Sequence, residues 1–231
     1  MSSFMFAPSS AQLAKQSPIL PYPKSVYSFW TGNNEITGTR KKNIKRNASH
    51  LRHLGITFYL VTPGNLNDFV SMTGVPLHEG YKHLSLIHKS DYLRCYFMHF
   101  VGGGYSDIKA MQGNWNKAFN DLTFSTDKYA NIASPTNTNP GTETTGFTVC
   151  SMICKKNTPF TREWYAKMTE LIDENIQELR KHTPGTNPYE EGDKYPLDYL
   201  APHSMSCAMC TRYQKHILQT TPTHAPSSIY R

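Results

Sequence analysis

Hydrophobic residues in the first third of the chain fall into short strand-like runs and a longer helical run. The strand-like runs are residues 25–30 and 56–61, and each is followed by residues typical of turns. Between them, residues 37–54 carry apolar side chains at the spacing of a helix face. Strand, helix and strand in this order predict a βαβ unit and therefore a parallel pair of strands.

The same criterion predicts the remaining elements. Helices are expected at residues 65–72, 77–87, 110–122 and 159–181, and strands at 129–133 and 147–154. Residues 135–146 are expected to form a loop, and the chain after Pro184 to be irregular. The pattern predicts one α/β domain from residue 24 to 231, with helices flanking a mostly parallel or mixed sheet, after a flexible lead-in at residues 1–23.

The most informative stretch is residues 88–109. Its aromatic residues keep helical spacing to Phe100, and Ser90 is the expected N-cap. Three glycines at 102–104 end this helix, and a short strand at 105–108 follows. Asp107 is thus predicted at the C-terminal end of a strand, the edge of an open α/β sheet where ligands bind.

Two further charged residues, Asp91 and Arg94, lie three apart and share one side of the predicted helix. Each charged residue taken alone has an ordinary interpretation. Asp91 and Arg94 could form an ion pair on the helix surface, and Asp107 could cap a loop. Three glycines before an Asp-bearing strand are a costly local choice unless the backbone turns tightly or approaches a ligand. The combination therefore favours a binding crevice.

The stretch resembles the DxD glycosyltransferases of the GT-A type, which have a Rossmann-type nucleotide-binding fold. They include capsular-polysaccharide sugar transferases, mannosyltransferase-like proteins, the glucosyltransferase domain of large clostridial toxins, and small chlorovirus enzymes that modify capsid protein. The shared pattern is Ser-Asp-x-x-Arg, an apolar helix, and a glycine-rich turn into Tyr-x-Asp-x-Asp. The matching residues here are Ser90, Asp91, Arg94, Gly103, Gly104, Tyr105 and Asp107.

The resemblance implies transfer of a hexose or deoxyhexose from a nucleotide sugar, with a UDP-sugar favoured, to a glycan or glycoprotein, with retention at the anomeric carbon. The implied catalytic residues are Asp91, Arg94 and Asp107. The implied donor-sugar residues are Ser90, Asp91, Arg94, Gly103 and Gly104. The implied nucleotide residues are Trp30, Thr31, Gly32, Tyr105 and Lys109, with Trp30 stacking on the base; the alternative for Trp30 is a place in the core.

The chain departs from this pattern at the last acid, normally a metal ligand, which is Lys109 here. In one interpretation Asp107 and a C-terminal ligand such as His203 hold Mn²⁺ or Mg²⁺, and Lys109 pairs with phosphate. In the other, the Lys109 ammonium group replaces the metal. The first is the preferred expectation. A C-terminal segment folded over the donor phosphates is also implied, and its candidate residues are Lys194, His203 and His224. For each of them alone, a solvated tail is the ordinary interpretation.

The net charge of the chain indicates what kind of partner it binds. The 231 residues carry a formal net charge of +7, which favours an anionic partner without choosing among them. Much of the basic charge lies in residues 40–52. A solvated helix face is the ordinary interpretation, and a nucleic-acid-binding module is the alternative function. No nucleic-acid motif accompanies the cluster, so nucleic acid is not the expected partner.

The remaining features concern compartment and cysteines. No apolar run is long enough to span a membrane and no signal peptide is evident, so a soluble cytoplasmic protein is expected. The five cysteines fit free thiols. A zinc site made of Cys150, Cys154, Cys207 and Cys210 is disfavoured, because the first two fall in one predicted strand, roughly 13 Å apart.

Overall fold

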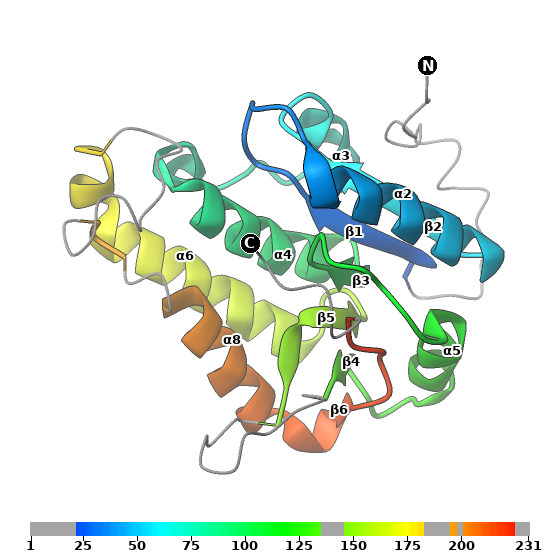
Figure 1. Cartoon of the computed structure of the whole chain (residues 1–231). Helices are drawn as coiled ribbons and strands as arrows, with labels where there is room; N and C mark the ends of the chain where they lie inside the picture. The colour runs from blue at the N-terminus through cyan, green and yellow to red at the C-terminus, as the bar shows by residue number, and fades with distance from the viewer. Residues whose placement is uncertain (1–21, 135–145, 183–194, 198–200, 225–231) are drawn as a thin grey trace, which may run out of the picture.

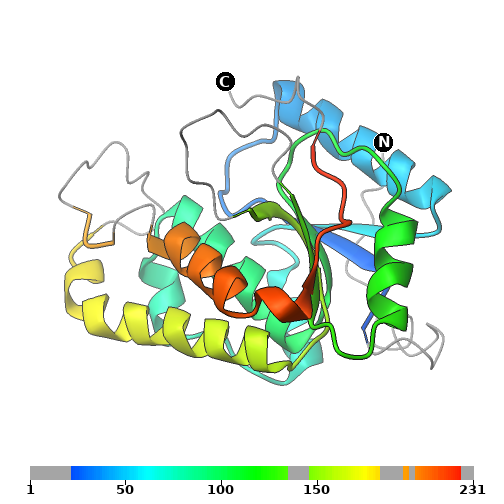
Figure 2. The same ribbon diagram turned by 90° about the horizontal axis from the view of Figure 1, so that it is seen from below.

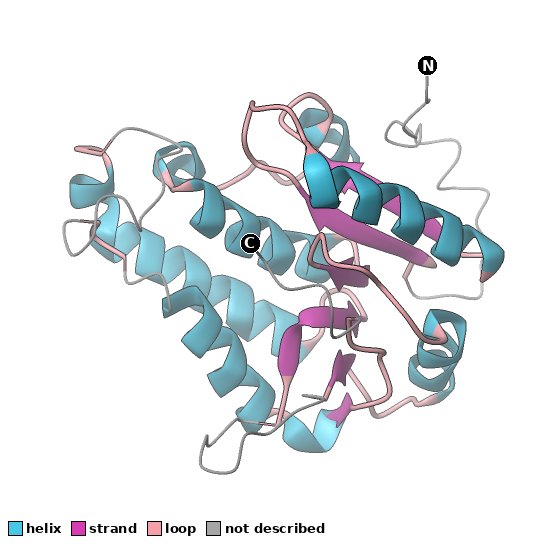
Figure 3. Ribbon diagram, viewed as in Figure 1, coloured by secondary structure: helices cyan, strands magenta, loops and turns pink. Residues whose placement is uncertain are grey.

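The computed structural model describes residues 22–134, 146–182, 195–197 and 201–224. In this part of the chain, a six-stranded sheet has the order β2-β1-β3-β5-β4-β6 and lies between two layers of helices (Figures 1 and 3). The strands are β1 (Ser25–Phe29), β2 (Thr57–Val61), β3 (Gly103–Ser106), β4 (Ala130–Ala133), β5 (Thr148–Cys154) and β6 (Ile217–Leu218).

The sheet is mixed in direction. β1 runs parallel to both of its neighbours, β2 and β3, which confirms the predicted parallel βαβ unit. β5 runs antiparallel to β3 and to β4, and β6 returns parallel to β4. The expected α/β class, with a mixed central sheet flanked by helices, is therefore present.

Helices cover both faces of the sheet (Figure 2). The longer ones are α2 (Gly38–His53), α3 (Leu66–Thr73), α4 (Leu86–Phe100), α5 (Trp115–Phe124), α6 (Pro159–Leu179) and α8 (Ala201–Arg212). Two short 3₁₀ helices are η1 (Glu79–His83) and η3 (Gln214–His216). Helices α2 and α5 lie on one face, and α4, α6 and α8 on the other (Figure 2).

Each face has its own apolar core because successive strand side chains point to opposite sides. Val26 of β1 packs with Trp115 and Phe119 of α5, whereas the next residue, Tyr27, packs with Phe97 of α4. The predicted apolar stripe of α6 packs into the core that contains Tyr27 and Phe97. Thr158 is the N-cap of α6, and its hydroxyl accepts a hydrogen bond from the backbone N–H of Thr161.

Several predicted boundaries were wrong. The N-cap of α4 is Ser85, whose hydroxyl accepts from the His88 N–H, so Ser90 lies inside the helix. The helix expected at 77–87 is only the 3₁₀ turn η1, and the one expected at 110–122 begins at Trp115. The strand expected at 105–108 begins two residues earlier, at Gly103.

The C-terminal region and the lead-in also differ from expectation. Helix α8 and strand β6 lie in the region expected to be irregular; α8 has no clear apolar stripe and β6 is two residues long, so neither has a strong sequence signal. Tyr22, assigned to the lead-in, is buried and stacks on Phe119. Residues 1–21 of the lead-in and 135–145 of the predicted loop lie outside the described part. Among the described helices, none is both long and apolar enough to cross a membrane.

Candidate functional site

A cleft of about 770 Å³ opens where β1 and β3 end. β1 lies between β2 and β3 in the sheet. The chain runs from β1 to β2 on one side of β1 and later returns to form β3 on the other side, so the connections diverge at the C-terminal end of β1. Such a switch point is where open α/β sheets bind ligands. The volume lies within the range usual for small-molecule sites, about 300–1,000 Å³.

The cleft brings together three segments far apart in sequence: the turn after β1, the N-terminal half of α4, and the end of β3. The predicted site residues that line it are Trp30, Thr31, Gly32, Ser90, Asp91, Arg94, Tyr105 and Asp107. The lining also includes Asn34 and Arg40, which the sequence analysis did not select for a site of this kind.

The turn after β1 is held by its own side chains. The indole N–H of Trp30 donates to the backbone carbonyl of Asn34 at 2.9 Å. The Arg40 guanidinium carbon lies 5.4 Å from the centre of the Trp30 ring, so α2 contributes a cation beside it. The Thr31 hydroxyl donates to the carbonyl of Leu86 at 2.7 Å and joins this turn to the first residue of α4.

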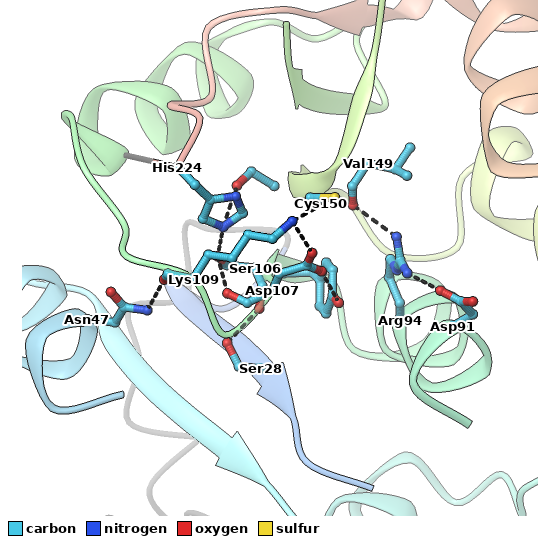
Figure 4. A network of polar contacts seen from close by, with 12 residues as sticks. Ser28, Asn47, Asp91, Arg94, Ser106, Asp107, Lys109, Val149, Cys150 and His224 are labelled. Atoms are coloured by element: carbon cyan, nitrogen blue, oxygen red, sulfur yellow. Dashed lines mark hydrogen bonds and ion pairs between the residues drawn. The ribbon is translucent and has the colours of Figure 1, made fainter. Parts of the chain in front are cut away.

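Asp91 and Arg94 form a buried ion pair on α4, with the Arg94 side chain only 9% exposed (Figure 4). The guanidinium also donates to the carbonyl of Val149 at 3.2 Å and lies 4.7 Å from the centre of the Tyr105 ring. Burial alone would lower the pKa of Arg94, but Tyr105, Asp91 and Asp107 outweigh it and the pKa is raised. Arg94 is therefore a permanent buried cation.

Asp107 follows β3 and is held from two sides (Figure 4). The Tyr105 hydroxyl donates to Oδ1 at 2.7 Å, and the Lys109 ammonium lies 3.0 Å from Oδ2. Burial alone would raise the pKa of Asp107, but the charges of Arg94 and Lys109 and the Tyr105 hydrogen bond lower it to about 2. The carboxylate is therefore ionised at neutral pH.

Lys109 is fixed through its backbone and its side chain. Its carbonyl accepts from the Asn47 amide at 2.7 Å, and its Nζ lies 3.8 Å from the Cys150 sulfur. Burial lowers the pKa of Lys109, but Asp107 and Cys150 together raise it by more. Among the described residues Lys109 does not line the cleft itself; it reaches the cleft through Asp107.

One C-terminal residue lies beside this group. The His224 Nε2 is 2.8 Å from the Ser106 hydroxyl and 3.4 Å from the Ser151 hydroxyl (Figure 4). Burial lowers the pKa of His224 to about 4, so the ring is neutral at pH 7. The sequence analysis gave His224, Lys194 and His203 as equal candidates for the C-terminal segment at the donor site. Lys194 and the His203 side chain lie outside the described part.

Gly103 and Gly104 were assigned to the donor sugar, but the structure does not place them on the cleft. Both lie in β3, against the neighbouring strand. A Cβ on Gly103 would lie 2.9 Å from the carbonyl oxygen of Ser25, and one on Gly104 would lie 3.0 Å from the Val26 side chain. The close approach of β1 therefore requires small residues here.

The residues around Asp107 do not fit a divalent metal site. Both carboxylate oxygens have partners, Tyr105 and Lys109. Lys109 and Arg94 place two positive charges where Mn²⁺ or Mg²⁺ would have to sit among oxygen ligands. Within the described part, no three His, Cys, Asp or Glu side chains gather into a metal-binding group.

The cysteines give no zinc site either. Cys150 and Cys154 lie in β5, as predicted, and Cys207 and Cys210 lie on α8; all are free thiols. Burial raises the pKa of Cys150 to about 12, with Asp107 adding to the effect, so this sulfur is a thiol beside Lys109. A thiol with a pKa raised this far carries little thiolate at neutral pH and is therefore unreactive.

Comparison with known proteins gives little sequence information. No family model matches the chain, and no curated protein matches it in sequence. Among solved structures, the PaToxG glycosyltransferase superposes on 84% of this chain and 70% of its own, with a TM-score of 0.47 and 14% identity. A likeness of this degree carries no argument about function, and we rest the functional proposal on the cleft.

Proposed function

We propose that the protein is a glycosyltransferase that takes its sugar from a nucleotide-sugar donor bound in the cleft. The transferred group is a hexose or deoxyhexose, the favoured donor a UDP-sugar, and the acceptor a glycan or glycoprotein. One observation carries this proposal. Three sequence segments that resemble the donor-binding pattern meet in a single cleft at the switch point of the sheet.

The nucleoside end of the donor would lie at the turn after β1. Trp30 offers an aromatic face, and stacking a base on such a face contributes roughly 1–3 kcal/mol. Its indole N–H is already bonded to Asn34, which fixes the ring before the donor arrives. Tyr105, between the Arg94 guanidinium and Asp107, would border the nucleoside from the other side.

The sugar would lie over the second turn of α4. The Asp91 carboxylate accepts and the Arg94 guanidinium donates hydrogen bonds, and together they suit the hydroxyls of a hexose. Their ion pair, and the Arg94 bond to Val149, hold both groups in place. Fixed groups of this kind orient the donor for reaction and so lower its entropic barrier.

The reaction breaks the bond between the anomeric carbon and the diphosphate oxygen, and the diphosphate leaves with the electron pair. The acceptor hydroxyl oxygen forms the new bond, and its proton passes to the departing diphosphate oxygen. Negative charge therefore grows on the diphosphate, where Arg94 and Lys109 supply positive charge close to the cleft. Retention at the anomeric carbon is part of the proposal and comes from the family resemblance.

Thermal unfolding with UDP, GDP, CMP and TDP, each with Mn²⁺ or with a chelator, tests donor binding. A nucleotide at 100 times its Kd stabilises the folded protein by about 2.7 kcal/mol, which shifts the midpoint measurably. Asp91→Asn and Asp107→Asn are expected to reduce the shift. Asp68→Asn, an exposed acid on α3, is the matched control and is expected to retain it.

The nucleotide that stabilises the protein identifies which nucleotide sugars to test as donors in an activity assay. Release of the nucleoside diphosphate from its sugar donors, with and without a glycoprotein acceptor, measures hydrolysis and transfer. If no nucleotide shifts the midpoint in either condition, the proposed function is wrong.

A second candidate function is nucleic-acid binding by α2, and one observation favours it. All six lysines and arginines of this helix are exposed, and the helix carries no acidic residue. If α2 contacts phosphates, the affinity for DNA or RNA falls steeply with salt, with a slope set by the number of contacts. Such binding would also be indifferent to Asp107→Asn, whereas donor binding would not.

A further inference from the structure

We propose that Lys109 takes the place of a divalent metal ion, so that the protein binds its nucleotide donor without a metal. This inference rests on the proposed function and deepens it. It concerns the counter-charge for the donor diphosphate, and it reverses the metal dependence that the family resemblance implies.

The geometry around Asp107 leaves no place for a metal ion. Its Oδ2 lies 3.0 Å from the Lys109 ammonium, and its Oδ1 accepts the Tyr105 hydroxyl at 2.7 Å. A metal bound to this carboxylate would have to displace a half-buried ion pair. The side chains are only 13% exposed for Asp107 and 21% for Lys109, so water screens their attraction weakly.

The charge balance of the cleft points the same way. Around Asp107, two carboxylates, Asp91 and Asp107, and two cations, Arg94 and Lys109, cancel in charge. The further cation of the lining, Arg40, lies beside Trp30 and outside this group. An acid at position 109, as in the family pattern, would leave this group with a charge of about −2, which a divalent ion neutralises. Lysine in place of that acid changes the charge by the same amount that the metal would supply.

The Lys109 ammonium group is also held in position before any donor binds. The Asn47 amide donates to the Lys109 carbonyl at 2.7 Å, and its own carbonyl oxygen accepts from the Met111 N–H at 2.9 Å. These bonds fix the backbone from Lys109 to Met111. Figure 4 shows the Lys109 side chain extending from this anchor towards Asp107 and Cys150.

A preorganised cation has the same advantage as a bound metal. It needs no reorganisation when charge develops on the leaving diphosphate. Lysine is a common phosphate-binding residue that acts as a point charge, and Arg94 adds a second cation that stays protonated. Together they provide the electrostatic stabilisation that the reaction requires.

The test measures nucleotide affinity by calorimetry for UDP, GDP, CMP and TDP, with a chelator and with Mn²⁺. For the wild type, the Kd of the bound nucleotide is expected to agree within about twofold between the two conditions. Lys109→Met is expected to weaken binding about tenfold or more in both, in keeping with the loss of a charged partner. Lys109→Asp, which creates an Asp-x-Asp pair, is expected to bind only with Mn²⁺.

Lys181→Met is the matched control, because Lys181 also forms an ion pair but lies exposed at the end of α6. It is expected to bind nucleotide like the wild type. Thermal unfolding of each variant shows whether it is folded. The wild-type comparison needs no variant and decides the question even if a Lys109 variant fails to fold.

The possible failures can be told apart. Wild-type binding that requires Mn²⁺ overturns the role of Lys109 but leaves the glycosyltransferase proposal intact. The role of Lys109 is likewise overturned if Lys109→Met binds like the wild type, or if folded Lys109→Asp does not respond to Mn²⁺. If no nucleotide binds in either condition, the proposed function fails and this inference falls with it.

Discussion

Two regions of the molecule concentrate charge, and they differ in every physical respect. In and beside the cleft, Asp91 and Arg94 are buried and Asp107 and Lys109 half-buried, and they form two ion pairs. The basic face of α2 carries six exposed cations and no acid in residues 38–53, almost the whole formal net charge of +7. In sequence the basic face is the more conspicuous of the two.

This contrast shows where charge matters energetically. Buried charges interact through a medium that screens them weakly, so removing one leaves its partner uncompensated at a high cost. Exposed cations are solvated in the folded and unfolded states alike, and each contributes little to stability. Local density of charge in a sequence is therefore a poor guide to a functional site, whereas buried charges of both signs in one cleft are a good one.

Arg94→Met should have the largest consequence. Removing this cation leaves Asp91 without its ion-pair partner and removes a positive charge near Asp107, which should lower the free energy of unfolding by about 3–5 kcal/mol. Urea unfolding measures the loss, and nucleotide binding is expected to fall with it. Arg180→Met removes an exposed arginine that pairs with Glu79 at 3.2 Å, and should cost at most about 1 kcal/mol. Equal costs for the two would contradict the contrast between buried and exposed charge.

The next effect is a pH dependence at the border of the cleft. The pKa of His224 is lowered from 6.5 to about 4, so the unfolded chain takes up this proton first as pH falls. The stability that a neutral His224 contributes is present above pH 6.5 and is lost as pH falls through about 4, for a total of about 3 kcal/mol.

His224→Gln should flatten the unfolding free energy between these two pH values. His53→Gln, at an exposed position of α2, is the control for removing a histidine. Asp107 does not interfere, because its pKa is lowered from 3.8 to about 2 and its contribution is lost only below pH 3.8. An unchanged slope in His224→Gln would show that this ring is not buried beside Ser106.

A smaller effect is expected at Trp30, where the two regions meet through Arg40. Trp30→Leu removes the stacking surface and should weaken nucleotide binding by roughly 1–3 kcal/mol, about 5- to 150-fold in Kd. Calorimetry with the identified nucleotide measures it. Phe124→Leu changes an aromatic ring that is 82% exposed at the end of α5, and no change in Kd is expected there. Equal affinities for the Trp30 variant and the wild type would assign Trp30 to the core alone.

Substitutions on the basic face itself should matter least. Replacing Lys42, Lys45, Arg46 and Arg52 together by Gln should change stability by no more than about 0.5 kcal/mol per residue, as is usual for surface positions. Nucleotide affinity should stay within about twofold, because these side chains are not among the described residues that line the cleft. A tenfold loss would make the basic face part of the donor site. Loss of salt-dependent DNA or RNA binding would instead support the second candidate function.

Elements with strong local signals could be predicted from the sequence alone. The parallel strands β1 and β2, helix α2 and helix α6 follow from apolar periodicity and from turn and cap residues, which act over a few positions. Most of the cleft residues were also marked in the sequence, because Ser90, Asp91, Arg94, Tyr105 and Asp107 stand in one recognisable pattern. The close spacing of these residues made them readable without knowledge of the fold.

Which distant residues share the site, and what each one faces, depended on the folded molecule. Arg40 and His224 reach the site from α2 and from the C-terminal segment, where no local pattern distinguishes them from other basic residues. The glycines at 103 and 104, which the pattern assigned to the sugar, proved to be set by the approach of β1. The pairing of Asp107 with Lys109, and hence the misfit to a metal, depends on burial and on side-chain direction. These are properties of the packed molecule, because contacts between residues far apart in sequence arise only when the layers assemble.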